Sequence, residues 1–429
     1  MSSDAGLLAL REVEQRLGIA DRLAACIDDP RNSAMVTHSL ADMIRFRLMM
    51  IAAGYEDGND ANDLRHDPIF KMALDHLPSG DRLCSQSSIS RLENLANVRA
   101  LVRMGRALVD LYCGSFRQVP KRITLDFDDT FDAVYGGQQL GFFNAHHDEY
   151  GFQPIVVFDG DGRFVTAMLR PAHRPKGKEI RAFMRRLVRA IRAHWPNTKI
   201  LVRADSHYCT PEVLDWCRSE GLDYILGVQP TSTLRRHVKA LEASTRERFK
   251  SLPPATAGAD PKARKVRRFK EFHDGAKSWS RVERIIARVE AGEMGVDTRF
   301  IVTSLTKRSP RHLYQGVYCA RGQAENHIKS WKTHLAADRT SCTKATANQF
   351  RLFLHAGAYW LLWSFRSQMP KRSTWKSIQF DTIRLRLIKI AARIVELKGQ
   401  IKVQLPSATP AASQVILRLV LGRIPPLVT

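Results

Sequence analysis

A run of strand-like segments in the first half of the chain constrains the fold more than any other feature. Residues 123–128 alternate apolar and acidic side chains, which places Asp126 and Asp128 on one face of a strand. The turn Asp159-Gly-Asp-Gly162 favours a hairpin, and two strand–helix units follow that hairpin. The predicted strands are 123–128, 154–158, 163–169, 199–204 and 224–228. This order predicts an α/β fold with a mixed sheet and helices packed on it.

The chain before this sheet, residues 1–118, is expected to form a helical N-terminal domain. Ser39 is a suitable N-cap for an apolar helical segment that Gly54 ends. Ser85–Glu93 has small polar residues followed by Arg91 and an outward-facing Glu93. Such a helix can enter a major groove, with Arg91 contacting DNA. A helical packing domain without DNA contacts fits the same residues.

The chain after this sheet divides into three parts. Residues 229–315 are basic and mostly strand-like, with a proline-rich loop inside them, and we expect them to form an insertion. Residues 316–368 return to a helical pattern. Residues 369–429 are expected to form a helical C-terminal region, with a helix over 383–397 and a short strand over 401–405.

One predicted helix, Tyr318–Lys332, collects charged groups on one side. Because each residue of a helix turns by about 100°, five of them fall within an arc of roughly 80°. They are Tyr318, Arg321, Glu325, Lys329 and Lys332. A single carboxylate thus lies among four groups that can hold phosphate. A solvated helix face with i,i+4 ion pairs is the alternative interpretation.

The charge of the chain indicates a polyanionic partner. Its 429 residues include 67 Lys and Arg against 43 Asp and Glu, for a formal charge of +24 that is spread along the sequence. Nucleic acid is the expected partner, although a ribosomal or membrane-surface protein would share this charge. The most apolar run, Leu352–Phe365, is too short to span a bilayer, and no signal peptide is visible. We therefore expect a cytoplasmic protein without a membrane partner.

The seven cysteines are scattered and contain no CxxC pair, which indicates reduced thiols. His207, Cys209 and Cys217 are close in sequence, but their spacing matches no zinc site.

Three carboxylates predict a different metal site. Asp128 lies near the end of the first strand, Asp205 ends the fourth strand, and Glu325 lies on the late helix. Together they would form an all-oxygen site suited to Mg²⁺ or Mn²⁺. Two such ions about 3.5–4 Å apart can activate a water or a 3′-hydroxyl for attack on a phosphodiester.

These residues resemble the DDE transposases of bacterial insertion sequences. The resemblance is carried by Leu125–Thr130, by Arg203-Ala-Asp205-Ser-His207 and by the Tyr-x2-Arg-x3-Glu-x6-Lys spacing from Tyr318 to Lys332. Gln138–Asn144, Asp148-Glu-Tyr150, Pro154 and Gly54-Tyr55-Glu-Asp57 are similar to group 1 of these DDE domains. The similarity extends from about Gly54 to the C-terminal helices. Asp126 and Asp129 flank the first aspartate, and the Asp-x-Thr pattern favours Asp128.

The resemblance implies an RNase H-like catalytic core made of residues 119–228 and 316–368, interrupted by the insertion. Asp128, Asp205 and Glu325 would ligate two Mg²⁺ ions, for which Mn²⁺ can substitute. Tyr318, Arg321, Lys329 and Lys332 would hold DNA phosphates. Trp279, in the insertion, would either stack on a flipped base or belong to the core. The implied partners are double-stranded transposon ends, target DNA and a second copy of the chain.

Two alternatives remain at the level of the sequence. Tyr318 could be the covalent nucleophile of a tyrosine recombinase, with Arg321 as its activator. The chain could also be a transposase-derived DNA-binding protein that no longer catalyses cleavage.

Overall fold

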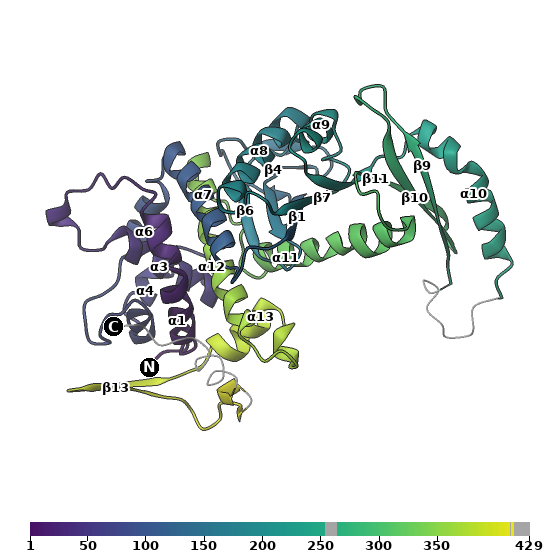
Figure 1. Cartoon of the computed structure of the whole chain (residues 1–429). Helices are drawn as coiled ribbons and strands as arrows, with labels where there is room; N and C mark the ends of the chain where they lie inside the picture. Colours follow the sequence, from purple (N-terminus) through teal and green to yellow (C-terminus); the bar gives the residue numbers. More distant parts are fainter. Residues whose placement is uncertain (254–263, 412, 416–429) are drawn as a thin grey trace.

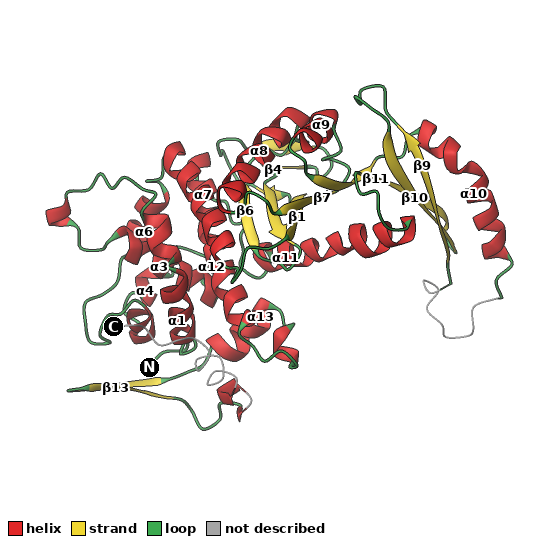
Figure 2. Cartoon of the chain, in the orientation of Figure 1, coloured by secondary structure: helices red, strands yellow, loops and turns green. Residues whose placement is uncertain are grey.

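An eight-stranded mixed sheet forms the centre of the protein, whose computed structural model describes residues 1–253, 264–411 and 413–415 (Figures 1 and 2). The strand order is β6-β5-β1-β7-β8-β11-β10-β9. The first five strands in chain order are β1 (Arg122–Asp129), β5 (Ile155–Asp159), β6 (Phe164–Met168), β7 (Lys199–Ala204) and β8 (Asp223–Val228). The strands β1, β5 and β6 are antiparallel, whereas β7 and β8 continue parallel to β1. The predicted mixed sheet is therefore confirmed.

Helices cover both faces of this sheet. Phe127 of β1 contacts Phe183 of α8 (Gly177–His194), which packs beside α9 (Pro211–Ser219). On the other face, Phe158 of β5 contacts Tyr359 of α12 (Ala345–Ser367).

The helix α11 (Gly322–Lys332) also lies on the second face, where it contacts β5 and α12. Side chains alternate along β1, so Asp126 and Asp128 point away from Phe127 and toward the face of α11.

The N-terminal helices share one apolar core with the sheet. They are α1 (Leu7–Leu17), α2 (Ile19–Ala24), α3 (Leu40–Ala53), α4 (Ala61–Leu64), α5 (Pro68–Ala73), α6 (Gln86–Glu93) and α7 (Val98–Gly114). As predicted, the Ser39 side chain caps α3 and Gly54 ends it, with a φ of 92°. The helix α12 contacts α1, α3, α6 and α7 as well as β6, and it is buried along most of its length. One continuous apolar cluster therefore joins the N-terminal helices to the sheet.

The insertion extends the central sheet instead of forming a separate one. It consists of α10 (Ser232–Lys250), β9 (Val266–Asp274), β10 (Glu283–Gly292) and β11 (Gly295–Thr303). The strand β11 pairs antiparallel with β8, and α10 packs on β9 and β10. Most of the loop predicted within the insertion falls on residues 254–263, which lie outside the described residues.

The C-terminal region corrects one prediction. Residues 383–397 do not form one helix: α13 (Phe380–Ile383) leads into a helical turn (Arg384–Ile388), and β12 (Arg393–Leu397) then pairs with β13 (Gln400–Gln404). Ile394 and Val403 pack on a small cluster with Ala5, which favours a half-buried hairpin over a helix. No helix in the described part of the chain is long and apolar enough to cross a membrane.

Candidate active site

Asp128 and Glu325 are both partners of one arginine. Arg321 donates a hydrogen bond of 2.7 Å from its Nη1 to Asp128 Oδ2. Its Nη2 lies 3.6 Å from Glu325 Oε1. The Asp128 side chain is 14% exposed, whereas that of Glu325 is 67% exposed. The guanidinium of Arg321 therefore occupies the space between the first and last predicted acids.

Asp126 has a structural role. Its carboxylate is 2% exposed and accepts two hydrogen bonds from Arg203, which in turn donates to the Val317 carbonyl at 2.7 Å. Both carboxylate oxygens are thus engaged by one buried cation, which leaves Asp126 poorly placed to bind a metal ion. This difference favours Asp128 as the ligand on this face of β1.

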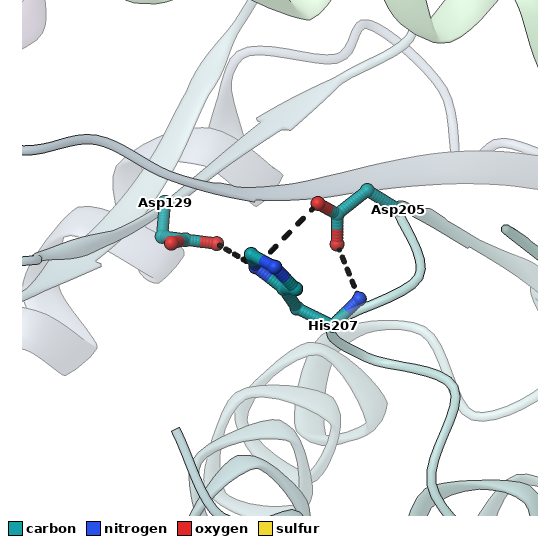
Figure 3. A group of neighbouring side chains, drawn as sticks. All are labelled: Asp129, Asp205 and His207. Atoms are coloured by element: carbon teal, nitrogen blue, oxygen red, sulfur yellow. Dashed lines mark hydrogen bonds and ion pairs between the residues drawn. The ribbon is translucent and has the colours of Figure 1, made fainter. Parts of the chain in front are cut away.

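A second cluster forms where β1 and β7 end (Figure 3). Asp129, Asp205 and His207 offer ligand atoms that lie within 4.8 Å of one another. Within the described part of the chain, these three form the one group of His, Cys, Asp or Glu side chains close enough to hold a metal ion. His207 Nδ1 lies 3.8 Å from Asp129 and 3.6 Å from Asp205, with no hydrogen-bond partner. The other oxygen of Asp205 accepts the backbone N–H of His207 at 2.9 Å. The side chain of Gln153 donates to Asp129.

Burial and like charge set the protonation of these groups. Burial raises the pKa of Asp128 to about 7; Arg321 opposes the shift, while Asp205 and Asp129 add to it. Burial would also raise the pKa of Asp129, but His207 and Gln153 lower it below its ordinary value. Asp129 in turn raises the pKa of His207. The raised pKa of Asp128 thus follows from burial and two acidic neighbours, whereas the lowered pKa of Asp129 follows from its own partners.

Asp128 and the second cluster line one polar pocket. It is lined by Asp128, Asp129, Thr130, Phe131, His146, His147, Gln153, Asp205, His207 and Lys332. Three carboxylates and an imidazole whose Nδ1 makes no hydrogen bond but lies near two of them suit a divalent cation such as Mg²⁺ or Mn²⁺. The residues at the ends of β1 and β7 therefore suit a divalent cation, whereas Glu325 is joined to Asp128 through Arg321 and is not among the residues that line this pocket.

The helical segment that carries the predicted phosphate ligands is continuous, but its winding changes. A π-helical turn (His312–Tyr318) passes into a 3-10 turn (Cys319–Arg321) and then into α11. Lys332 reaches the loop after β1, where its Nζ lies 3.3 Å from Asp132 and donates to the Phe131 carbonyl. Lys329 is exposed on α11. In this structure Arg321 and Lys332 thus bind β1 and the loop that follows it.

Tyr318 is packed against the sheet. Its hydroxyl approaches Gly227 of β8 so closely that a Cβ there would lie 2.7 Å away. Burial raises the pKa of this phenol, whereas a nucleophilic tyrosine needs an activated hydroxyl. The geometry therefore disfavours the tyrosine recombinase alternative.

The two remaining predicted DNA contacts have different surroundings. Arg91 is exposed on α6 and donates to Ser88 at 3.3 Å. Glu93 does not face outward as predicted. It is buried and lies 3.3 Å from the buried Arg47 and 3.9 Å from Arg351 of α12. Glu93, one of the two residues predicted to face outward, therefore belongs to the core.

Trp279 lies in the loop between β9 and β10 and packs half-buried against apolar residues of the insertion. These apolar surroundings favour a role for Trp279 in packing over stacking on a flipped base.

Sequence reasoning missed the grouping of Asp129 with His207 and Gln153. The Asp205-Ser-His207 spacing was the available signal, because His207, three residues past the end of β7, can turn its side chain back toward that end. Cys209 and Cys217 do not join His207, and all seven cysteines are free thiols.

A family model for the transposase DDE domain group 1 matches residues 1–429, the whole chain. The chain belongs to this family. No curated protein matches it. Among solved structures, the cryo-EM structure of a piggyBac transposase synaptic complex with hairpin DNA is similar at 12% identity and a TM-score of 0.39, covering 100% of this chain and 86% of that one. A simian T-cell lymphotropic virus intasome in complex with PP2A regulatory subunit B56 gamma is similar at 12% identity and a TM-score of 0.19, covering 52% and 92%. Both likenesses are too remote to assign a function.

Proposed function

We propose that this transposase belongs to a bacterial insertion sequence, binds its terminal inverted repeats and moves it by metal-dependent DNA cleavage and strand transfer. The convergence of Asp128 and Asp205 on one pocket, with Glu325 joined to Asp128 through Arg321, is the observation that carries this proposal. Together with family membership over the whole chain, it favours an active enzyme over an inactive DNA-binding derivative.

The acids would hold the metal ions. Asp128, Asp205 and Glu325 are the proposed ligands, and Asp129 and His207 lie close enough to add ligands or to orient Asp205. When bound, two Mg²⁺ ions would activate a water or a 3′-hydroxyl and stabilise the leaving oxygen. For Glu325 to join Asp128, Arg321 must leave the space between them.

Arg321 would then be free to hold a DNA phosphate. Its guanidinium has donors for a carboxylate or a phosphate, so it can exchange one anion for the other. Lys329 is exposed one turn beyond Glu325 and would contact the same DNA strand as Arg321. Tyr318 and Lys332, at the two ends of the same helical segment, are the other proposed phosphate ligands. A phosphate would replace Asp128 as the partner of Arg321 when metal and DNA bind together.

Each region of the chain would have its own role in binding DNA or in catalysis. Residues 1–118 would recognise the transposon ends, with Arg91 of α6 as a contact. Residues 119–228 and 316–368 would form the catalytic core. The basic insertion 229–315 and the region 369–429 would support the DNA and the pairing of two chains. Synapsis of two ends implies a homodimer that also binds target DNA.

Incubation of the protein with a plasmid that carries the native ends of its element tests this function. Mg²⁺ should support cleavage at both ends, and EDTA should abolish it. Cleavage that persists in EDTA would favour a tyrosine recombinase, and metal-independent end binding without cleavage would favour an inactive derivative.

A further inference from the structure

Arg203 lies next to the acids of the candidate active site, on the central strands of the sheet. In the parallel pairing of β1 and β7 it is the partner of Asp126. Asp128 lies two residues beyond Asp126 on the same face of β1, about 7 Å along the strand, and Asp205 follows directly after β7. The pair of Asp126 and Arg203 therefore forms the row of side chains that precedes the acids.

The guanidinium of Arg203 makes three directed hydrogen bonds. Its Nε and Nη2 donate to the two carboxylate oxygens of Asp126, and its Nη1 donates to the Val317 carbonyl at 2.7 Å. The side chains of Arg203 and Asp126 are 7% and 2% exposed. Because the guanidinium is planar and rigid, the two-point contact with Asp126 fixes the direction of the third nitrogen. The sheet thus determines, through this arginine, where the Val317 carbonyl is held.

Val317 lies where the helical segment of the site changes its winding. It belongs to the π-helical turn, four residues before Arg321 and eight before Glu325, and a 3-10 turn and α11 follow that turn. A residue turns the chain by about 120° in a 3-10 helix and by about 100° in an α-helix. Each residue that changes its winding therefore rotates the residues after it by about 20°, which moves a side-chain end by about 2 Å.

Tyr318 is also in contact with the sheet, at β8. A Cβ at Gly227 would lie 2.7 Å from the Tyr318 hydroxyl and 2.9 Å from the backbone nitrogen of Ser206. At the other end of the segment, Trp331 is fully buried and contacts Phe164 of β6. Both ends of the segment are thus fixed to the sheet, and the charged residues between them take their position from these contacts.

We propose that Arg203 is a positioning residue for DNA cleavage. By holding the Val317 carbonyl, it sets the rotation of the turn that follows. The approach of Arg321 and Glu325 to Asp128 depends on that rotation. This inference rests on the proposed function, because it takes Asp128 and Glu325 as metal ligands. Arg203 acts through the backbone and needs no contact of its own with metal or DNA.

Arg203→Lys tests this role in the full-length protein. Lysine keeps the charge opposite Asp126, but its single nitrogen cannot hold Asp126 and the Val317 carbonyl in the geometry of a guanidinium. On prebound DNA with native ends and in saturating Mg²⁺, the single-turnover rate of cleavage should fall about a hundredfold, as expected for misplacement by about 1 Å. The affinity for duplex DNA should stay that of the parent.

Arg218→Lys is the matched control. Arg218 also joins two carboxylates, those of Asp215 and Glu283, and its side chain is 16% exposed, but it connects α9 with β10. This variant should lose stability as Arg203→Lys does and should cleave at the parental rate. Equal losses of cleavage in the two variants would assign the effect to stability and overturn the inference.

Hydrogen exchange gives a second readout that does not require cleavage. The backbone amides of residues 316–325 should exchange faster in Arg203→Lys, while those of α12 should keep the parental rate. If the parent does not cleave in Mg²⁺, the proposed function fails, and this comparison still tests the contact with Val317. Unchanged exchange, or parental cleavage by the folded variant, would contradict a positioning role.

A second variant serves if Arg203→Lys does not fold. Asp126→Asn/Arg203→Met replaces both members of the buried ion pair, so no unpaired charge remains. It lacks a donor for the Val317 carbonyl and should cleave about a hundredfold more slowly than the parent. Its affinity for Mn²⁺ should stay parental, which separates this loss from the loss of a metal ligand. Cleavage at the parental rate would overturn the inference.

Discussion

Asp126 and Asp128 lie two residues apart on one face of β1, yet their partners give them different roles. Asp126 is enclosed with Arg203, whereas Asp128 borders the polar pocket and shares Arg321 with Glu325. Period-two alternation in the sequence predicted that both point the same way. It could not separate them, because the separation comes from an arginine on the adjacent strand.

These two aspartates should respond oppositely to the same substitution. Asp126→Asn leaves the buried Arg203 without its counter-charge, so we expect a loss of about 3 kcal/mol in the free energy of unfolding. Asp128→Asn should leave the melting temperature near that of the parent and lower metal-dependent cleavage by at least about a hundredfold, as for a lost charge-stabilising group. Denaturant unfolding and plasmid cleavage measure the two effects. A stable Asp126→Asn protein without cleavage would move the metal ligand to Asp126.

Metal binding should depend on pH through Asp128 and His207. The pKa of Asp128 is raised to about 7, so this carboxyl is largely protonated at pH 6, and the raised pKa of His207 means that this imidazole keeps its proton to a higher pH than usual. Neither can then ligate a cation, and Mn²⁺ affinity should rise between pH 6 and pH 8.

Calorimetric titration of Mn²⁺ at both pH values measures this dependence. The variants Asp128→Asn and His207→Gln should each bind more weakly and with a smaller pH dependence. Glu220→Gln, at an exposed carboxylate directly after α9, should behave as the parent does. Equal affinity of the parent at both pH values would exclude these two groups from the site.

At the scale of elements, Lys332 joins α11 to the loop after β1. Asp132, its ionic partner, is 1% exposed, and burial raises the pKa of that carboxyl to about 7 despite the lysine. The sequence predicted the position of Lys332 on the helix, and assigned it to phosphate. Its partner within the chain depends on the path of residues 130–132, which no helical period encodes.

A double-mutant cycle tests this link between the two elements. Lys332→Met should destabilise the protein by about 3 kcal/mol, because it leaves a buried carboxylate without its cation. Adding Asp132→Asn should recover part of that loss, which gives a favourable coupling between the two sites. If the two substitutions act additively, and Lys332→Met is as stable as the parent but binds DNA poorly, Lys332 contacts phosphate directly and not through Asp132.

Other elements show why sequence patterns succeed and fail here. The strands of the core and the helix α8 were predicted because their apolar periods are clear over many residues. The orientation of Glu93 was wrong because Arg47 and Arg351, far away in sequence, draw it inward. The first strand of the hairpin, β12, was predicted as helix, because alternating basic and apolar residues fit either period over a short window.

At the scale of the whole molecule, the excess of 24 positive charges should determine how DNA affinity responds to salt. Each phosphate neutralised by Lys or Arg releases condensed counterions, so affinity should fall with a log–log slope of about −5 or steeper. Fluorescence anisotropy with a duplex of the transposon end, measured from low to moderate salt, gives this slope. A slope near zero would assign the charge to another partner.

The central claim is that acids at the ends of β1 and β7 perform metal-dependent DNA cleavage, and Asp205 tests it most directly. Asp205→Asn keeps the size of the side chain and its acceptor for the His207 N–H while removing one negative charge from the pocket. Cleavage of a plasmid with native ends, measured in Mg²⁺ beside duplex binding, should show no product for Asp205→Asn and parental binding. The control Asp161→Asn, at a carboxylate 77% exposed, should cleave as the parent does. Parental cleavage by Asp205→Asn in Mg²⁺ would contradict the proposed metal site.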